Sequence, residues 1–577
     1  MPRKKEVGKI KDLLPLIVIL GLTVFTISYF QRNPVKPPYI EKVDDWQYTP
    51  TSDGIGNYSP LGIHQKITGV AAPESDLGFA AGGAKDINNF RDNIENNYLP
   101  IPTDLPYEGL FYDYYFDTGQ AKQCNELFCP SYSKAVTRDP LSAETEYYMT
   151  VGLNSNLKKE DFERKKLNLI LVLDVSGSMS SGFSEYYYDR FGNKHRVEEP
   201  SGKSKMEAAS ESLAALTEHL EEGDRLGIVL FNNQAYKAKP MRLVEETDMS
   251  AIRNHILEIE AGGGTNMAAG MDMATQMLQE YKNADKSKYE NRIIFMTDMM
   301  PNIGVRSESG LLGKMKDNAD DGIYTSFVGI GVDFNTELVE AITKVDGTNY
   351  FSVHSSKQFS ERMDDDFEYM VTPLVFDLTL ELDSDSYRIK KVYGSTAADE
   401  ATGEIMKVNT LFPSRKQDGE TKGGIVLLQL EKIGDDSDLD LTVTYETREG
   451  EVRTSSSSVE FEIRESEYFE NLGIRKAVLL TRYADLMKNW IIYERSQIPD
   501  SDVPIDAVRT AEMEGIEPPW IFPGLGRWER QSKPLTISEL YIEKIQLFKE
   551  HFEQEMDTID DNTLEQEVDI MEKLAGY

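Results

Sequence analysis

A series of apolar segments that alternate with amphipathic segments, between about residues 165 and 357, constrains the fold of this chain most strongly. The first segment, "LNLILVLDV" from Leu167, is apolar at nearly every position, which is typical of a strand buried on both faces of a parallel sheet. The next, "KMEAASESLAALTEHL" from Lys205, has its apolar residues at helical spacing. The alternation predicts an α/β domain with a doubly wound, mostly parallel, Rossmann-like sheet.

Side chains that carry oxygen follow three of the predicted strands. Asp174, Ser176 and Ser178 lie in "DVSGSM", Thr265 lies in "GGGTN" before a helix, and Asp298 ends "RIIFMTD". Ligands of open α/β sheets bind at the carboxyl ends of the strands, so these side chains are expected to converge. Carboxylates and hydroxyls are hard oxygen ligands of the kind that Mg²⁺ accepts together with water. The sequence therefore predicts a site for Mg²⁺ or, alternatively, Mn²⁺ or Ca²⁺.

The composition of this set leaves the predicted cation open to a further ligand. Only two of the five side chains are anionic, and the three hydroxyls are neutral. A carboxylate from a partner protein could therefore complete the coordination shell of the divalent ion. Each motif alone fits a helix cap or a tight turn about as well as a metal loop. The three motifs together favour the metal site.

"DVSGSM", "GGGTN" and "FMTD", in this order on a βα series, resemble the metal-ion-dependent adhesion site of the von Willebrand factor type A (vWA) domain, over about residues 165–357. The resemblance implies that the five residues are metal ligands and that an acidic residue of a protein partner is the final ligand. One departure is Met299-Met300-Pro301, where many relatives have glycine after the last aspartate. The flanking segments resemble, more loosely, bacterial membrane-anchored proteins of this type and inter-alpha-trypsin inhibitor heavy chains.

The segments before and after the α/β domain have different sequence patterns. Residues 370–465 alternate apolar and polar side chains, which predicts antiparallel strands, and further strands are expected within residues 106–160. These strands could form one β-sandwich, with the α/β domain inserted in it or flanked by it. Residues 466–577 predict a helical C-terminal region, and the proline- and glycine-rich residues 31–105 predict a linker.

The N-terminus predicts a membrane anchor. Residues 13–30 contain no charged side chain, and several basic residues lie within residues 1–12. We expect a cytoplasmic tail over 1–12, one transmembrane helix over 13–30, and a main body outside the cytoplasm, in a single-pass protein of the cell membrane. A cleaved signal peptide is the alternative, and the length of the apolar run and the absence of a small-residue cleavage pattern disfavour it.

Composition and motifs narrow the function. A formal net charge of −37 argues against a nucleic-acid partner, because phosphates would be repelled. No H-E-x-x-H pattern occurs and no Gly-x-Ser-x-Gly elbow surrounds Ser176, so we expect neither an enzyme nor a small-molecule substrate. The expected function is metal-bridged binding of a protein partner. The alternatives are a structural or regulatory subunit of a membrane complex with a fold-stabilising metal and, less favoured, a metal-dependent hydrolase.

Two local features have alternative interpretations. Cys124 and Cys129 could form a disulfide outside the cytoplasm, where such bonds are permitted. Residues 180–204 separate the first metal loop from its helix. This insert is either a tyrosine-rich contact surface on the rim of the site or a polar loop.

Overall fold

The computed structural model describes residues 41–49, 76–85, 87–119, 127–128, 130–158, 164–183, 186–188, 194–196, 202–298, 310–331, 344–353, 355–395, 405–434, 438–461, 467–497 and 533–576. The chain divides into two compact units, Met1–Val43 and Asp44–Tyr577, and the second contains every helix and strand named below.

Several predicted features lie outside the described residues. They include the transmembrane helix over 13–30, both cysteines, most of the 180–204 insert and Met299-Met300-Pro301. None of the helices in the described ranges combines the length and the apolar character needed to cross a bilayer. The predicted span and orientation stay predictions.

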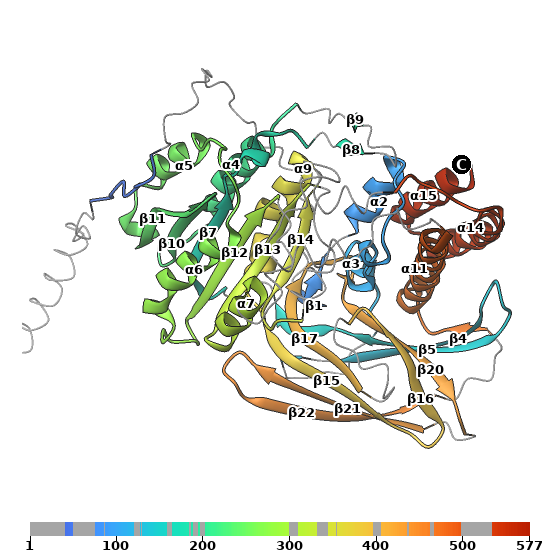
Figure 1. The fold of residues 1–577 in the computed structure, drawn as a ribbon. Coiled ribbons are helices and arrows are strands. Elements are labelled where there is room, and N and C mark those ends of the chain that lie inside the picture. The colour runs from blue at the N-terminus through green and yellow to red at the C-terminus, as the bar shows by residue number, and fades with distance from the viewer. Residues whose placement is uncertain are drawn as a thin grey trace, which may run out of the picture. The chain divides into compact units, whose positions relative to one another are not determined.

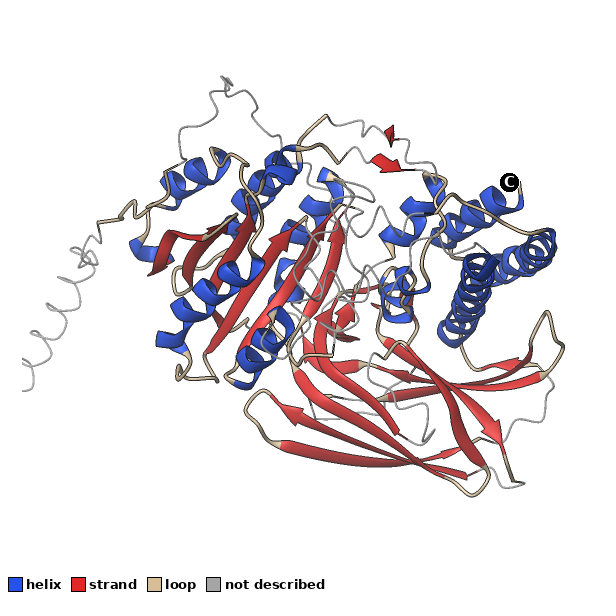
Figure 2. Ribbon diagram, in the orientation of Figure 1, coloured by secondary structure: helices blue, strands red, loops and turns tan. Residues whose placement is uncertain are grey.

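The α/β domain has the predicted doubly wound architecture (Figures 1 and 2). Its seven-stranded sheet has the order β11-β10-β7-β12-β13-β14-β2, and every neighbouring pair is parallel except β10 and β11. The strands are β2 (Gly83–Ala84), β7 (Lys166–Asp174), β10 (Arg225–Phe231), β11 (Ala235–Leu243), β12 (Tyr289–Thr297), β13 (Ile323–Ile330) and β14 (Asn349–Val353).

Helices cover both faces of this sheet because the central strands bury side chains on both sides. Leu169, Leu171 and Leu173 of β7 belong to one core cluster with α4, α5, α9 and α10, whereas Ile170 and Val172 belong to another with α6 and α7. The helices are α4 (Lys205–Leu216), α5 (Met249–Leu257), α6 (Met267–Leu278), α7 (Leu311–Asp320), α9 (Ser356–Ser360) and α10 (Phe367–Val371). This arrangement explains the continuous apolar run of β7.

Two antiparallel sheets form a β-sandwich with a shared apolar core. The six-stranded sheet comprises β22 (Val452–Glu460), β21 (Asp438–Thr447), β15 (Val375–Asp383), β17 (Ile405–Ser414), β1 (Asp76–Ala81) and β6 (Asn154–Lys158). The five-stranded sheet comprises β16 (Tyr387–Tyr393), β20 (Ile425–Lys432), β5 (Thr145–Gly152), β4 (Ser131–Arg138) and β23 (Tyr468–Phe469). Both sheets combine strands from before and after the α/β domain, so this domain is inserted in the sandwich.

Small elements complete the described strands. A three-stranded sheet contains β18 (Lys416–Gln417), β19 (Glu420–Lys422) and β3 (Tyr115–Phe116). A hairpin within the insert contains β8 (Tyr186–Tyr188) and β9 (Lys194–Arg196).

The predicted linker over 31–105 contains ordered elements, which corrects the prediction from composition. Residues 76–84 form β1 in the sandwich and β2 in the α/β sheet, and α2 (Asn88–Glu95) and the 3₁₀ helix Pro102–Asp104 follow. The glycine-rich sequence here reflects close packing, since a Cβ on Gly78 would lie 2.0 Å from a methyl carbon of Thr421. The segment from Tyr107, expected as a strand, begins with the helix α3 (Tyr107–Tyr112).

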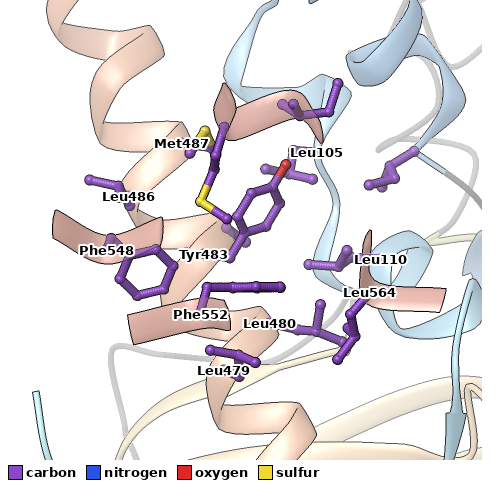
Figure 3. Packing of buried hydrophobic residues seen from close by; sticks show 14 of the residues in the cluster. Leu105, Leu110, Leu479, Leu480, Tyr483, Leu486, Met487, Phe548, Phe552 and Leu564 are labelled. Carbon is purple, nitrogen blue, oxygen red and sulfur yellow. The ribbon is translucent and has the colours of Figure 1, made fainter. Parts of the chain in front are cut away.

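The helical C-terminal region forms as predicted. It consists of α11 (Leu472–Gln497), α14 (Glu539–Ile559) and α15 (Glu565–Ala575). Their apolar side chains share one core with α2, α3 and the five-stranded sheet. Figure 3 shows part of this core, including Leu105, Leu110, Tyr483, Phe548 and Phe552.

Candidate metal centre

The first predicted metal loop lies at the point where the strand order of the α/β sheet reverses. From β7 the chain goes to β10 on one side, and it later returns to β12 on the other side of β7. The helices α4 and α6, which follow β7 and precede β12, pack on opposite faces of the sheet, and in such sheets ligands bind at the carboxyl ends of the strands. Asp174 is the last residue of β7. The loop that follows it therefore occupies the position where doubly wound sheets bind ligands.

Asp174 is fully buried and held by hydrogen bonds at both carboxylate oxygens. Its Oδ1 accepts a hydrogen bond from the backbone N–H of Ser176 at 2.8 Å, and its Oδ2 accepts one from the Thr297 hydroxyl. Burial raises the pKa of the Asp174 carboxyl to about 6, and the hydrogen bonds from Thr297 and Ser176 oppose this rise. The side chain is thus fixed in orientation before any cation binds.

Three further predicted ligands continue from Asp174 as a hydrogen-bonded row. The hydroxyl oxygens of Ser176 and Ser178 lie 3.0 Å apart. The Ser178 hydroxyl also donates to Asp298 Oδ1 at 2.8 Å. Asp298 follows β12, so the row joins the ends of two adjacent strands. The structure therefore brings Asp174, Ser176, Ser178 and Asp298 together.

Backbone contacts bring the "GGGTN" loop to the same edge of the sheet. Gly262 N–H donates to the carbonyl of Val175 at 2.7 Å, and Gly177 N–H donates to the carbonyl of Gly263 at 2.9 Å. Gly263 has a φ of +92°, which glycine adopts without the strain that a Cβ would cause. Thr265 follows, half-buried, but no hydrogen bond within the described residues links its side chain to the other four.

Two asparagines after β10 support this second loop. Asn232 donates to the carbonyl of Gly262 at 2.9 Å, and the side-chain oxygen of Asn233 accepts from Gly264 N–H at 2.9 Å. Asn266 then caps α6 by accepting from Ala269 N–H at 3.2 Å. Neither asparagine belongs to the predicted metal motifs, although both directly follow an apolar strand, a position that indicates a role at this edge of the sheet.

Lys205 also lies at the site, although it belongs to none of the predicted metal motifs. Its ammonium nitrogen lies 3.2 Å from Asp298 Oδ2, and the two side chains are 8% and 0% exposed. A capping box between Ser204 and Glu207 starts α4, so that Lys205 is its first residue. Gly331, at a φ of +92° after β13, leaves room for the lysine, since a Cβ there would lie 3.1 Å from Nζ. One of the two acidic groups of the site thus has a built-in counter-ion.

The donor set fits a hard divalent cation. It consists of carboxylate and hydroxyl oxygens, which suit Mg²⁺ and leave places for water or an external ligand. The described residues contain no group of three or more His, Cys, Asp or Glu side chains placed to hold a metal. Any cation held at this edge of the sheet would therefore depend on the serine and threonine hydroxyls as well as on the two aspartates.

Two of the described histidines have carboxylate partners elsewhere than at the serines of this site. Ser176 and Ser178 hydrogen-bond each other and Asp298. Among the described histidines, His219 contacts Asp364 and His255 contacts Asp44. An activated serine requires a base within hydrogen-bonding distance, and neither of these histidines serves Ser176 or Ser178.

Residues 169–300 match the family model of the von Willebrand factor type A domain. Inter-alpha-trypsin inhibitor heavy chain H4 of Bos taurus is 22% identical over 246 residues, which are 42% of this chain and 23% of that protein. Heavy chain H2 of Homo sapiens is 21% identical over 211 residues, 36% of this chain and 20% of that protein. The chain thus spans less than a quarter of the length of these curated relatives.

Solved structures also resemble this chain. The von Willebrand factor type A protein from Catenulispora acidiphila has a TM-score of 0.39 and 13% identity, covering 64% of this chain and 82% of that one. A structure of proximal thread matrix protein 1 from the mussel byssus, described with a zinc-occupied MIDAS motif, has a TM-score of 0.26 and 15% identity, covering 36% and 46%. The motif order, the doubly wound sheet and the family match show a vWA domain over residues 169–300, and the chain is similar to the inter-alpha-trypsin inhibitor heavy chains over part of its length.

Proposed function

We propose that this protein binds a protein partner through a divalent cation held by Asp174, Ser176, Ser178, Thr265 and Asp298. The observation that carries the proposal is the row of hydrogen bonds that joins Asp174, Ser176, Ser178 and Asp298 at the switch point of the sheet. When bound, such a cation supplies a positive centre that a carboxylate from outside can coordinate. The protein's own residues fix the geometry of that centre.

The charges around the site support an acidic partner residue. Lys205 offsets the charge of Asp298, so the site presents the cation with less negative charge than two free carboxylates would. The chain as a whole has a formal charge of −37 and repels acidic molecules at long range. Attraction of an acidic ligand therefore has to come from the bound cation itself, and a chelator is expected to abolish it.

We further propose that the main body acts outside the cytoplasm, anchored by residues 13–30. The apolar character of this segment and the basic residues before it support the proposal. Extraction of the native protein from membranes tests the anchor. Release by alkaline carbonate without detergent would contradict it.

Asp174→Ala tests the cation site directly. The full chain should bind Mg²⁺ or Mn²⁺ in a calorimetric titration, and the variant should bind it about 100-fold more weakly or not at all, because a buried carboxylate ligand is lost. Asp272→Ala, which removes an exposed carboxylate from α6, is the matched control and should bind as the native chain does. Equal affinity of all three proteins would overturn the proposed site.

Crosslinking in native membranes then tests the partner. Crosslinked products should disappear with chelator and in the Asp174→Ala chain, and should persist in the Asp272→Ala chain. If chelator lowers only the melting temperature and leaves the products unchanged, the cation stabilises the fold instead, as in a structural subunit.

A further inference from the structure

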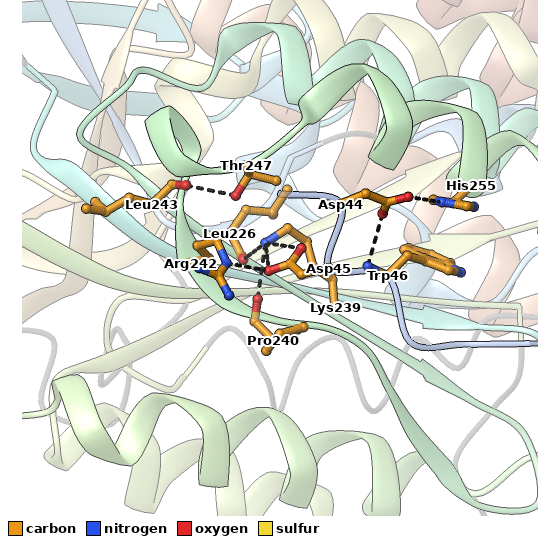
Figure 4. Close-up of polar contacts among 10 residues, drawn as sticks. All are labelled: Asp44, Asp45, Trp46, Leu226, Lys239, Pro240, Arg242, Leu243, Thr247 and His255. Carbon is orange, nitrogen blue, oxygen red and sulfur yellow. Dashed lines mark hydrogen bonds and ion pairs between the residues drawn. The ribbon is translucent and has the colours of Figure 1, made fainter. Parts of the chain in front are cut away.

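Residues 44–48, Asp-Asp-Trp-Gln-Tyr, lie against the outer edge of the vWA sheet (Figure 4). The backbone N–H of Gln47 donates to the carbonyl of Ala238 on β11 at 2.7 Å. β11 is the edge strand of the sheet, which leaves its outer backbone groups open to an added segment. We call residues 44–48 the strap. The sequence alone predicted these residues only as part of the linker over residues 31–105.

Asp45 anchors the strap through a buried charge. Its carboxylate lies 3.4 Å from Lys239 Nζ and 2.8 Å from Arg242 Nε, and its side chain is 7% exposed. The Lys239 side chain is fully buried and also donates to the carbonyls of Leu226 and Pro240, at 3.0 and 3.1 Å. Removing Asp45 would leave a buried ammonium without its carboxylate partner, which is costly.

Aromatic contacts extend the recognition on both sides of Asp45. The Trp46 ring stacks on His255 of α5, with centroids 5.3 Å apart and planes 11° apart. Asp44 Oδ2 lies 3.0 Å from Nε2 of the same histidine. The Tyr48 ring meets Tyr236 of β11 edge-on at 5.3 Å. Asp44 and Trp46 thus share His255, whereas Asp45 and Tyr48 contact other side chains of the domain.

We propose that the β11–α5 edge of the vWA domain is a peptide-binding surface for an acidic and aromatic segment, and that its occupant is the strap of the same chain. The contacts follow the pattern of a peptide added to a sheet edge, in which backbone contact is combined with separate side-chain sites. Lys239 and Arg242 make this surface cationic on a strongly acidic protein, so it selects acidic segments. The proposal does not depend on the metal site.

Strap binding places residues 44–48 along the edge strand β11. It also shields an edge strand that would otherwise be open to pairing with other chains. The boundary between the two compact units falls at Val43 and Asp44, immediately before the strap. The strap is therefore the first segment of the second unit.

A labelled synthetic peptide of residues 41–49 tests the proposal against the full chain. In fluorescence anisotropy it should bind a chain whose strap is disabled by Asp45→Ala and Trp46→Ala. It should not bind the native chain, because the tethered strap competes at high effective concentration. A peptide with Asp45→Asn should bind about tenfold more weakly or worse, since it cannot neutralise Lys239.

Two further chains keep the test decisive. If the disabled chain does not fold, a chain with Trp46→Ala and Tyr48→Ala retains the Asp45 charge and should bind the native peptide more tightly than the native chain does. A chain with Asp45→Asn and Lys239→Met removes both members of the buried pair, and it should fold without binding the peptide. Failure of the native peptide to bind any folded strap variant, or equal binding of the two peptides, would overturn the proposal.

Discussion

Lys205 places a fixed positive charge beside the candidate cation site. Because it pairs with Asp298 in a nearly buried position, its charge is poorly screened from a cation bound nearby. We expect Lys205→Met to bind Mg²⁺ about tenfold more tightly, because the repulsion between the ammonium and the cation disappears and Asp298 no longer pairs with the lysine. The same variant should unfold at a lower temperature in the presence of chelator, since Asp298 loses its counter-ion. Calorimetry and thermal unfolding measure the two effects.

Lys203→Met is the matched control for this prediction. Lys203 lies two residues earlier, pairs with Glu211 at 2.6 Å, and has a side chain that is 35% exposed. Its removal should change neither cation affinity nor stability by a measurable amount. Weaker Mg²⁺ binding by Lys205→Met would show instead that the lysine orients Asp298 for the cation.

The candidate ligands were predictable from the sequence because each lies in a short motif next to a recognisable strand or helix. "DVSGSM" and the end of "RIIFMTD" each follow an apolar strand, and the sheet brings the two strand ends together. Lys205 was not predictable in this way, because the insert at 180–204 separates it from the first loop. Its contact with Asp298 depends on how α4 packs against the end of β12.

At the scale of secondary-structure elements, Asp224 joins the starts of two vWA strands. Asp224 is fully buried, and its carboxylate accepts a hydrogen bond from the backbone N–H of Leu167 in β7 at 2.7 Å. The same carboxylate accepts two hydrogen bonds from the Arg164 guanidinium, at 2.7 and 3.0 Å. We expect Asp224→Ala to lower the free energy of unfolding by about 3–5 kcal/mol, because Arg164 is left buried without its partner. Denaturant unfolding followed by circular dichroism measures this loss.

Glu221→Ala is the control that distinguishes the loss of the buried Arg164–Asp224 pair from the loss of a surface charge. Glu221 also approaches Arg164, at 3.8 Å, but its side chain is 65% exposed. Its removal should change stability by no more than about 0.5 kcal/mol. A comparable loss in both variants would contradict the argument from burial.

Elements with their own hydrophobic pattern were predictable, and elements defined by their neighbours were not. β7, α4 and β12 carry the expected periodicity and form where it indicates. The helix α3 has only six residues, too few to be stable alone, and forms because Leu110 and Phe111 enter the helical core. β2 has two residues and is a strand only because it pairs with β14.

At the scale of the whole molecule, Asp346 lies where the vWA domain meets the sandwich. Asn409 of β17 donates to the carbonyl of Lys344 at 3.0 Å, and Gly347 N–H donates to the Thr410 hydroxyl at 2.8 Å. Burial first, and then the neighbouring Asp377, raise the pKa of Asp346 to about 6. A carboxyl with a raised pKa favours the folded state while it is protonated and loses that contribution as pH rises through 6.

Asp346→Asn should therefore stabilise the protein at pH 8 and have a progressively smaller effect as pH falls from 6 towards the ordinary aspartate pKa near 4. The measurement is the difference in unfolding free energy between variant and native chain at several pH values. Asp383→Asn, at the exposed end of β15, is the control and should give a difference within about 0.5 kcal/mol throughout. A gain from Asp346→Asn that does not depend on pH would contradict the titration of this carboxyl.

The strand segment 76–84 contributes to two different sheets, first as β1 between β17 and β6 and then as β2 beside β14. A fragment excised at residues 165 and 357 would lose β2 and leave Asn349 and Tyr350 paired with β13 alone. Transferring this vWA domain to another protein would therefore require residues 76–85 as well, although they are distant in the sequence. Evolution can reshape the loops of such a domain more easily than it can exchange the domain itself.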